Sequence, residues 1–376
     1  MSILGALLLA SCLAQPQDPQ TAQLFAQIDL PSQSSPGAML EVLHYISPMR
    51  TVKEMPETEW QFPFVSVGMA ETAAGAGASV RFRVFSQSRA SETPDEISQW
   101  VTRMMVRLWD YAYYRCDLDH NPRTQKTVDV YLCKSGDSGS QQKFVYDYQE
   151  LDAADRPSPK NLIAVYQMDK AKRGIQLSRE LAHEYGHAVI PPAGGFEKPE
   201  SYTNGDIGER VFLAMFRDDL AKGKLAPEDT LFTDKAALDA YYDAKVKPIV
   251  LSMAGSGPDF PLLKTRTETA YWGYVNTIVY LSRICPPRLF GRTLALTTRA
   301  AEDLGPAVKS AAEEQPTWEV SIPAELKGKP LFIPLVKGTV TGAKVLKKSG
   351  DWAMIQPEPG KKVVVANPPL PPDSKS

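Results

Sequence analysis

The stretch SRELAHEYGHAVIPPAGGF, residues 178–196, holds two of the four histidines of the 376-residue chain. Apolar residues recur in it at helical spacing, and the helix must end at Pro191 and Pro192, because proline lacks the amide hydrogen that a helix needs. The sequence therefore predicts a helix of roughly 15 residues here. Residues four apart lie on one helical face, so we expect His183 and His187 side by side.

Two imidazoles on one helical face can bind one zinc ion, and a catalytic zinc site adds a third protein ligand and keeps one position open. Glu184 follows His183 directly, where its carboxylate can take a proton from the water that the ion activates and pass it to a leaving amine. Gly186 is small and leaves room for another segment to approach His187. The spacing predicts a zinc site with Glu184 as general base, and the alternative is a helix whose histidines bind no metal.

The third ligand has to come from another segment. The metzincin pattern would place a glycine and then a third histidine after His187, but Ile190 and Ala193 occupy those positions. A carboxylate downstream is the alternative. The amphipathic segment NGDIGERVFLAMF, residues 204–216, offers Glu209 near its start.

At this point residues 175–216 resemble the gluzincin metallopeptidases, in which a glutamate on the next helix completes a His-His-Glu zinc site. The resemblance implies peptide-bond hydrolysis, with His183 and His187 as zinc ligands. It also implies Glu184 as the general base and Glu209 as the third ligand.

Alternatives to Glu209 remain open. The asparagine that precedes this glutamate in gluzincins is absent, because Gly208 stands in its place. Asp206 would be the ligand in an aspartate-type variant. Glu197 and Glu200 are closer in sequence, but they lie in a Pro- and Gly-rich loop, which is a less rigid platform for a ligand. A hydrolytic site also needs a donor for the developing oxyanion, and the candidates, which the sequence does not rank, are Tyr202, Tyr271, Tyr274 and Arg210.

Strand-like and helical segments surround this motif. TVDVYLC (127–133) and NLIAVYQM (161–168) indicate strands before it, and helical stripes dominate after it. We predict an α+β fold with a zincin-like metallopeptidase core, which consists of a helix, a mixed sheet, the active-site helix and a helical C-terminal half. The expected parts are a signal segment (1–14), a tether (15–36), an N-terminal β module (37–90), the zincin-like domain (91–312), a C-terminal β module (313–368) and a tail (369–376).

The first residues predict export. The apolar run 3–10 is too short to span a bilayer and fits the central region of a secretory signal peptide. LASC, residues 9–12, resembles the bacterial lipoprotein box, in which the cysteine becomes lipidated. We expect a cell-envelope protein with a lipid on Cys12, and the alternative is secretion after cleavage behind Ala14.

The charge composition limits which classes of binding partner are expected. The chain has 42 basic and 44 acidic residues and a net charge of −2. This balance does not indicate the basic patch with which proteins bind nucleic acid. We expect a peptide or protein substrate, and membrane contact only through a lipid on Cys12. The second function class is a non-enzymatic surface protein that binds through its β modules. In an exported protein Cys116 and Cys133 could form a disulfide, or all of Cys116, Cys133 and Cys285 could be buried thiols; the sequence leaves both open.

Overall fold

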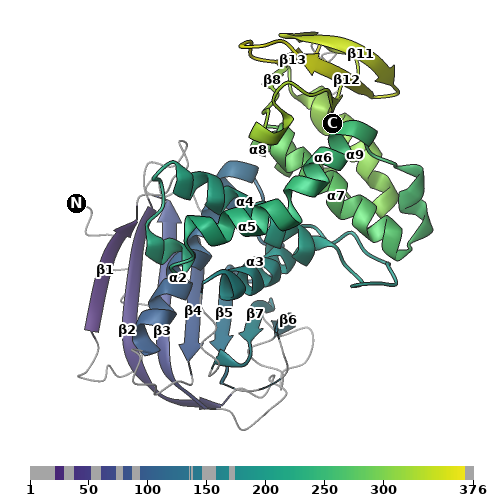
Figure 1. The fold of residues 1–376 in the computed structure, drawn as a ribbon. Helices are drawn as coiled ribbons and strands as arrows, with labels where there is room; N and C mark the ends of the chain where they lie inside the picture. The colour runs from purple at the N-terminus through teal and green to yellow at the C-terminus, as the bar shows by residue number, and fades with distance from the viewer. Residues whose placement is uncertain are drawn as a thin grey trace.

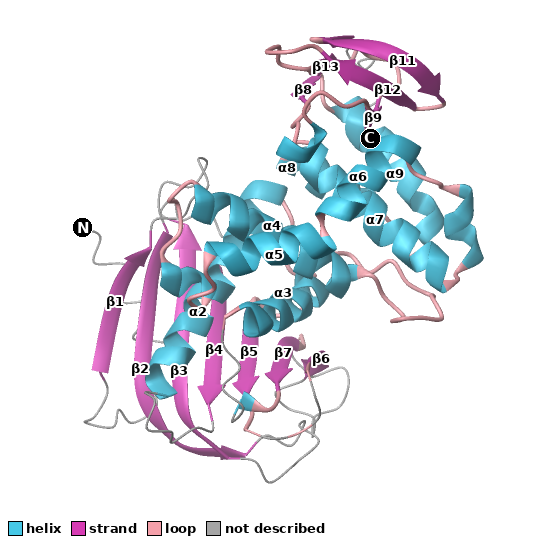
Figure 2. Cartoon of the chain, in the orientation of Figure 1, coloured by secondary structure: helices cyan, strands magenta, loops and turns pink. Residues whose placement is uncertain are grey.

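The computed structural model describes residues 22–28, 38–51, 61–72, 79–86, 94–134, 136, 139–145, 158–168 and 174–368. These residues form an α+β fold with one large mixed sheet, a helical half and two small sheets near the C-terminus (Figures 1 and 2). The α+β class predicted from the sequence is therefore confirmed. The signal segment with Cys12 and the tail 369–376 lie outside the described residues.

The large sheet has seven strands in the order β1-β2-β3-β4-β5-β7-β6. The first four strands form an antiparallel meander, whereas β4, β5 and β7 are parallel neighbours and β6 returns antiparallel to β7. The strands are β1 (Ala22–Ile28), β2 (Ala38–Thr51), β3 (Gln61–Thr72), β4 (Ser79–Ser86), β5 (Thr127–Leu132), β6 (Ser140–Val145) and β7 (Lys160–Val165).

The N-terminal strands differ from the predicted separate module. β4 pairs with β5 from Arg81 beside Thr127 to Ser86 beside Leu132, so residues on both sides of the predicted boundary at 90 belong to one sheet. Part of the predicted tether, residues 22–28, forms β1. Local alternation identifies a strand, but it does not reveal which distant strand becomes its neighbour.

Two helices cover one face of this sheet (Figure 1). α2 (Pro94–Asp110) begins at Pro94 and packs on β3 and β4. Most of its apolar stripe is buried, and Ile97 and Trp100 are partly buried. A short π-helix (Tyr111–Arg115) extends it. α3 (Ile175–Val189) carries the two histidines and packs on β6 and β7. Its 15 residues match the predicted length and end before Pro191, because the proline pair cannot continue the helix.

The helical half follows α3. α4 packs along α3 and contacts α5 and α7. Its first turn therefore faces the histidine-bearing helix. The helices are α4 (Asn204–Ala221), α5 (Lys235–Lys245), α6 (Lys247–Ser256), α7 (Glu268–Ile284), α8 (Pro287–Leu296) and α9 (Leu304–Glu314).

Two three-stranded sheets, in the orders β10-β13-β8 and β11-β12-β9, form the C-terminal part beside α6 and α9. Among the described residues, no helix has the length and apolar content needed to cross a membrane. Cys116, Cys133 and Cys285 are buried free thiols, so no disulfide joins Cys116 to Cys133. The strands are β8 (Thr317–Glu319), β9 (Leu331–Pro334), β10 (Thr339–Thr341), β11 (Ala343–Ser349), β12 (Trp352–Pro357) and β13 (Val364–Ala366).

Candidate metal centre

The two helices that build the site pack with their backbones in contact. A Cβ added to Gly186 of α3 would lie 2.5 Å from the carbonyl oxygen of Asn204, and one added to Gly208 of α4 would lie 2.6 Å from the Cα of Gly186. Real Cβ atoms do not approach other heavy atoms so closely, so this crossing requires glycine on both helices. It brings the first turn of α4 under the histidines of α3.

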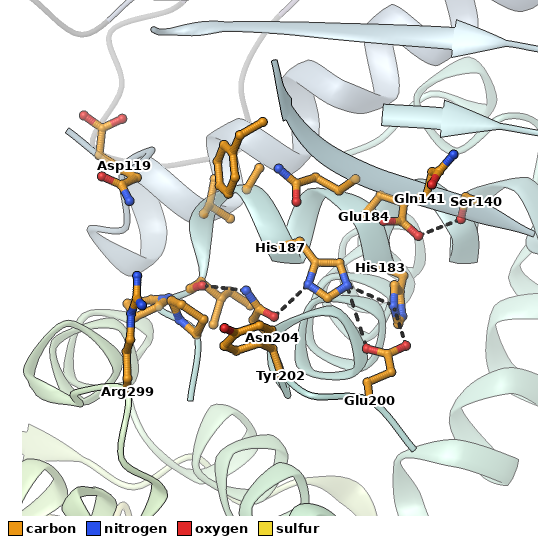
Figure 3. A pocket seen from close by; sticks show the side chains of 18 of the residues that line it. Asp119, Ser140, Gln141, His183, Glu184, His187, Glu200, Tyr202, Asn204 and Arg299 are labelled. Carbon is orange, nitrogen blue, oxygen red and sulfur yellow. Dashed lines mark hydrogen bonds and ion pairs between the residues drawn. The ribbon is translucent and has the colours of Figure 1, made fainter. Parts of the chain in front are cut away.

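The two imidazoles point at one another across this crossing. The Nε2 atoms of His183 and His187 lie 3.2 Å apart (Figure 3). Two nitrogens that bind one zinc ion at about 2.0–2.1 Å in a tetrahedron lie about 3.3 Å apart, so the spacing fits a shared ion. Gly205 faces the pair, since a Cβ there would lie 2.4 Å from Nε2 of His183 and 2.5 Å from Nε2 of His187.

Glu200 supplies the carboxylate that converges with both imidazoles. Its Oε1 lies 3.2 Å from Nε2 of His183, and its Oε2 lies 3.8 Å from Nε2 of His187. Figure 3 shows the carboxylate beneath the two rings. These three side chains each offer one ligand atom within 4.8 Å of the others. They are the donors that could hold a metal ion together.

Glu209 and Asp206 lie elsewhere around His183. Among the described residues, the other group with converging ligand atoms is His183, Asp206 and Glu209, and it does not include His187. The Oε2 of Glu209 lies 3.7 Å from Nδ1 of His183, on the side of the ring opposite Nε2. Asp206 accepts a hydrogen bond from the Tyr271 hydroxyl (2.7 Å) and pairs with Arg210. Neither carboxylate meets both histidines.

The outer nitrogens of the histidines have partners that orient the rings. Nδ1 of His187 lies 2.7 Å from Oδ1 of Asn204. An amide oxygen only accepts, so this Nδ1 carries the hydrogen and leaves the Nε2 lone pair free for a metal. The amide nitrogen of Asn204 donates to the carbonyl of Ile190 (3.1 Å), which fixes the amide orientation.

Glu209 is held in its place by two further groups. Arg179 donates to its Oε1 from 2.7 Å, and the Tyr241 hydroxyl donates to the same oxygen from 2.9 Å. Burial would raise the pKa of Glu209, but the hydrogen bonds from His183 and Arg179 lower it to about 2. Burial would lower the pKa of His183, yet the hydrogen bonds to Glu200 and Glu209 raise it to about 10. A metal that binds Nε2 must displace that proton.

The loop that carries Glu200 is braced along its length. Gly194 and Tyr202 form a β-bridge, and the Gly195 amide donates to the carbonyl of Ser201 (3.1 Å). From outside the loop, Arg266 donates to the carbonyl of Gly194 (3.0 Å). The loop is therefore a hairpin with fixed backbone bonds, and Glu200 sits on a firmer platform than its Pro- and Gly-rich sequence suggests.

Glu184 lies on the sheet side of the two imidazoles. Its Oε1 accepts a hydrogen bond from the hydroxyl of Ser140 on β6 at 2.8 Å, and the residue is 4% exposed. Burial raises the pKa of Glu184 to about 7, against the lowering effects of the charge on His183 and the Ser140 bond. Periodicity does not reveal Ser140 as a partner, because it belongs to another strand.

A cavity of about 730 Å³ opens beside this cluster. Of the four oxyanion candidates, Tyr202 lines the cavity and is 43% exposed. The Tyr271 hydroxyl is bonded to Asp206, Tyr274 is fully buried, and Arg210 pairs with Asp206. Figure 3 shows Tyr202 next to Asn204 and Glu200, and Arg299 farther along the wall.

The comparisons with known proteins were negative. The chain matches no protein-family model, and a search of the curated proteins finds no relative.

Proposed function

We propose that the chain is a zinc-dependent peptidase with a zincin-like core, in which His183, His187 and Glu200 bind the ion. The observation that carries the proposal is the convergence of the two Nε2 atoms, 3.2 Å apart, with a carboxylate whose oxygens lie 3.2 and 3.8 Å from them. Two imidazoles and a carboxylate form a known donor set of catalytic zinc sites, which leave one position open.

The surroundings of the histidines support the same assignment. Histidines that bind metals donate their other ring N–H to a carboxylate or carbonyl, which sets ring orientation and basicity. Asn204 has this relation to His187, and Glu209 lies 3.7 Å from the outer nitrogen of His183. We therefore assign Glu209 as a positioning residue. Gly205 keeps the space between α4 and the two rings free of a side chain.

We therefore align the gluzincin pattern with this chain differently, starting from Asn204. In that family an asparagine directly precedes the ligand glutamate. Asn204 contacts His187 and is followed by Gly205, whose Cα faces both Nε2 atoms. On this register the family's ligand position falls on Gly205, which has no side chain. Glu200, from the preceding hairpin, supplies the carboxylate in its place.

The chain's own residues would perform the hydrolysis around the ion. Bound zinc supplies a Lewis acid that polarises a carbonyl and lowers the pKa of water. Glu184 accepts the proton of the attacking water and returns it to the leaving amine, while Ser140 fixes one of its oxygens. Tyr202 lines the cavity and its hydroxyl has no hydrogen-bond partner among the described residues, so it can donate to the developing oxyanion.

The first test is metal-dependent hydrolysis. Purified protein is incubated with a mixed peptide library as prepared, after chelation, and after zinc is returned. We expect cleavage products that disappear on chelation and reappear with zinc. Cleavage that is indifferent to chelation would contradict the proposal. An intact library together with tight peptide binding would favour the non-enzymatic binding protein.

The second test identifies the ligands. Glu200→Gln, Glu209→Gln and the matched control Glu197→Gln are loaded with zinc and dialysed against a weak chelator before metal analysis. Glu197 lies on the same loop, is exposed and does not join the converging donors. We expect Glu200→Gln to lose the metal and the control to keep it. Glu209→Gln should bind zinc about 10- to 100-fold more weakly, the usual effect of losing an outer partner. Retention by Glu200→Gln with loss by Glu209→Gln would restore Glu209 as the ligand.

A further inference from the structure

We infer that the cavity selects substrates that carry a carboxylate, which pairs with Arg299, together with an apolar group beside it. This inference rests on the proposed zinc site, because the ion fixes where the reacting bond lies. Arg299 lines the same cavity as the two histidines, Glu184 and Glu200 (Figure 3). It is the one arginine or lysine among the described residues that line it.

Arg299 differs from the other arginines near the site because it has no ion-pair partner among the described residues. Arg179 pairs with Glu209, Arg210 with Asp206, and Arg266 with Glu302. Asp119, an acidic residue on the cavity wall, is paired with Lys126 at 2.9 Å. A guanidinium presents a planar fork of donors that matches a carboxylate, and here that fork faces open space.

The backbone of Arg299 is fixed relative to the metal ligands. The Gly194 amide donates to the carbonyl of Arg299 (3.0 Å), and Gly194 also pairs with Ala300. Gly194 belongs to the hairpin that carries Glu200, through its bridge to Tyr202. One short backbone connection therefore links the proposed ligand to the cation. The backbone of Arg299 therefore keeps a fixed place relative to the hairpin of Glu200.

An apolar wall gives the second recognition element. Phe144 on β6 lines the cavity and is 51% exposed, although large aromatic side chains are usually buried. Pro122, Val189 and Pro191 line the same space. Apolar surface in the same cavity as an arginine that has no ion pair among the described residues fits a substrate with an apolar side chain and one negative group. The carboxylate can be the C-terminus of a peptide or an acidic side chain.

The test uses binding to the zinc-loaded full chain, so that turnover is not needed. Three series of peptides carry a hydroxamate head to bind zinc and a phenylalanine next to it. The first ends in a free carboxylate, the second is amidated and has an aspartate, and the third is amidated and uncharged. Each is made with one, two and three residues after the phenylalanine, and binding is measured by calorimetry.

We expect at least one carboxylate probe to bind about tenfold or more tightly than its uncharged counterpart, as for a charge-assisted hydrogen bond. Tighter binding by the first series identifies a C-terminal carboxylate, and by the second an acidic side chain. In Arg299→Gln the advantage should fall below about twofold. Arg288→Gln is the matched control, because Arg288 is also exposed, has no ion pair within the described part of the chain and does not line the cavity; it should retain the advantage.

The outcomes separate this inference from the proposed function. Equal binding of charged and uncharged probes to wild type overturns the carboxylate preference and leaves the zinc site standing. An advantage that survives Arg299→Gln overturns the assignment to Arg299. If no probe binds the zinc-loaded protein, the zinc site fails, and the inference fails with it.

Discussion

Replacing Gly205 by alanine should weaken metal binding strongly without harming the fold. A Cβ at this position would lie 2.4 Å from Nε2 of His183 and 2.5 Å from Nε2 of His187. The nearest atoms are the ends of side chains, so the rings can rotate away and the helices need not separate. Gly205 lies in the first turn of α4, where alanine is favoured over glycine by up to about 1 kcal/mol.

The magnitude follows from the number of ligands displaced. Losing only an outer partner of one ligand weakens metal binding about 10- to 100-fold. Moving two ligands themselves should cost no less than two such losses, which is about 10²- to 10⁴-fold. The unfolding free energy of the metal-free protein should instead stay equal to wild type or rise by up to about 1 kcal/mol. The substitution should therefore lower zinc affinity while the stability of the metal-free protein stays unchanged or rises.

The assay pairs urea unfolding of the metal-free protein with zinc titration against a fluorescent chelator. Gly255→Ala in α6 is the matched control, because it is also a helical glycine and a Cβ there meets nothing within 4 Å. The control should keep wild-type zinc affinity. If Gly205→Ala binds zinc within about threefold of wild type, the two rings do not converge in front of α4 as argued. A large loss of stability in the metal-free protein would equally contradict the reasoning.

Three further outcomes follow from the same geometry. Gly208→Ala pushes a Cβ into the backbone of α3, 2.6 Å from the Cα of Gly186, and should lower the unfolding free energy by about 1–3 kcal/mol or more in urea titration; an unchanged midpoint would mean that the helices can move apart freely. Glu184→Gln should keep its zinc but lower kcat by about 10²- to 10⁴-fold in a peptide assay; unchanged turnover would place the base elsewhere. Asn204→Ala should weaken zinc binding about 10- to 100-fold by chelator competition, and wild-type affinity would show that the His187 contact does not orient the ring.

Local rules predicted the helix of the site well. Its periodicity and the two prolines at 191–192 set the bounds that α3 shows, Ile175–Val189. The small size of Gly186 indicated a close approach beside His187, and α4 makes that approach. These features depend on residues close in sequence, where helix geometry and proline chemistry act directly.

Features that depend on distant partners were not visible in the sequence. The platform of Glu200 is braced by Arg266 and by the backbone of Arg299, which lie on segments far from the loop. The same reason applies to Ser140, which reaches Glu184 from the strand β6. Likewise, β4 and β5 pair in parallel, but the alternation of apolar and polar residues within each strand does not reveal which strand becomes its neighbour.

One signal for the third ligand was present but needed the structure to be interpreted. On the register that we propose, the pair Asn204-Gly205 keeps the asparagine of the gluzincin pattern and lacks the glutamate. That proposed register depends on the hydrogen bond that His187 donates to Asn204 and on the position of Gly205 in front of both rings, which only the structure supplies. Glu209 lies one helical turn beyond Gly205 and meets the outer nitrogen of His183 instead.

The most direct measurement is anomalous diffraction at the zinc absorption edge from crystals of the zinc-loaded full chain. We expect one strong peak about 2.0–2.2 Å from Nε2 of His183, Nε2 of His187 and a carboxylate oxygen of Glu200. Glu209 should remain on the Nδ1 side of His183, outside bonding distance of the peak. A peak bound to Glu209 or Asp206 in place of Glu200, or no peak between the two histidines, would contradict this expectation.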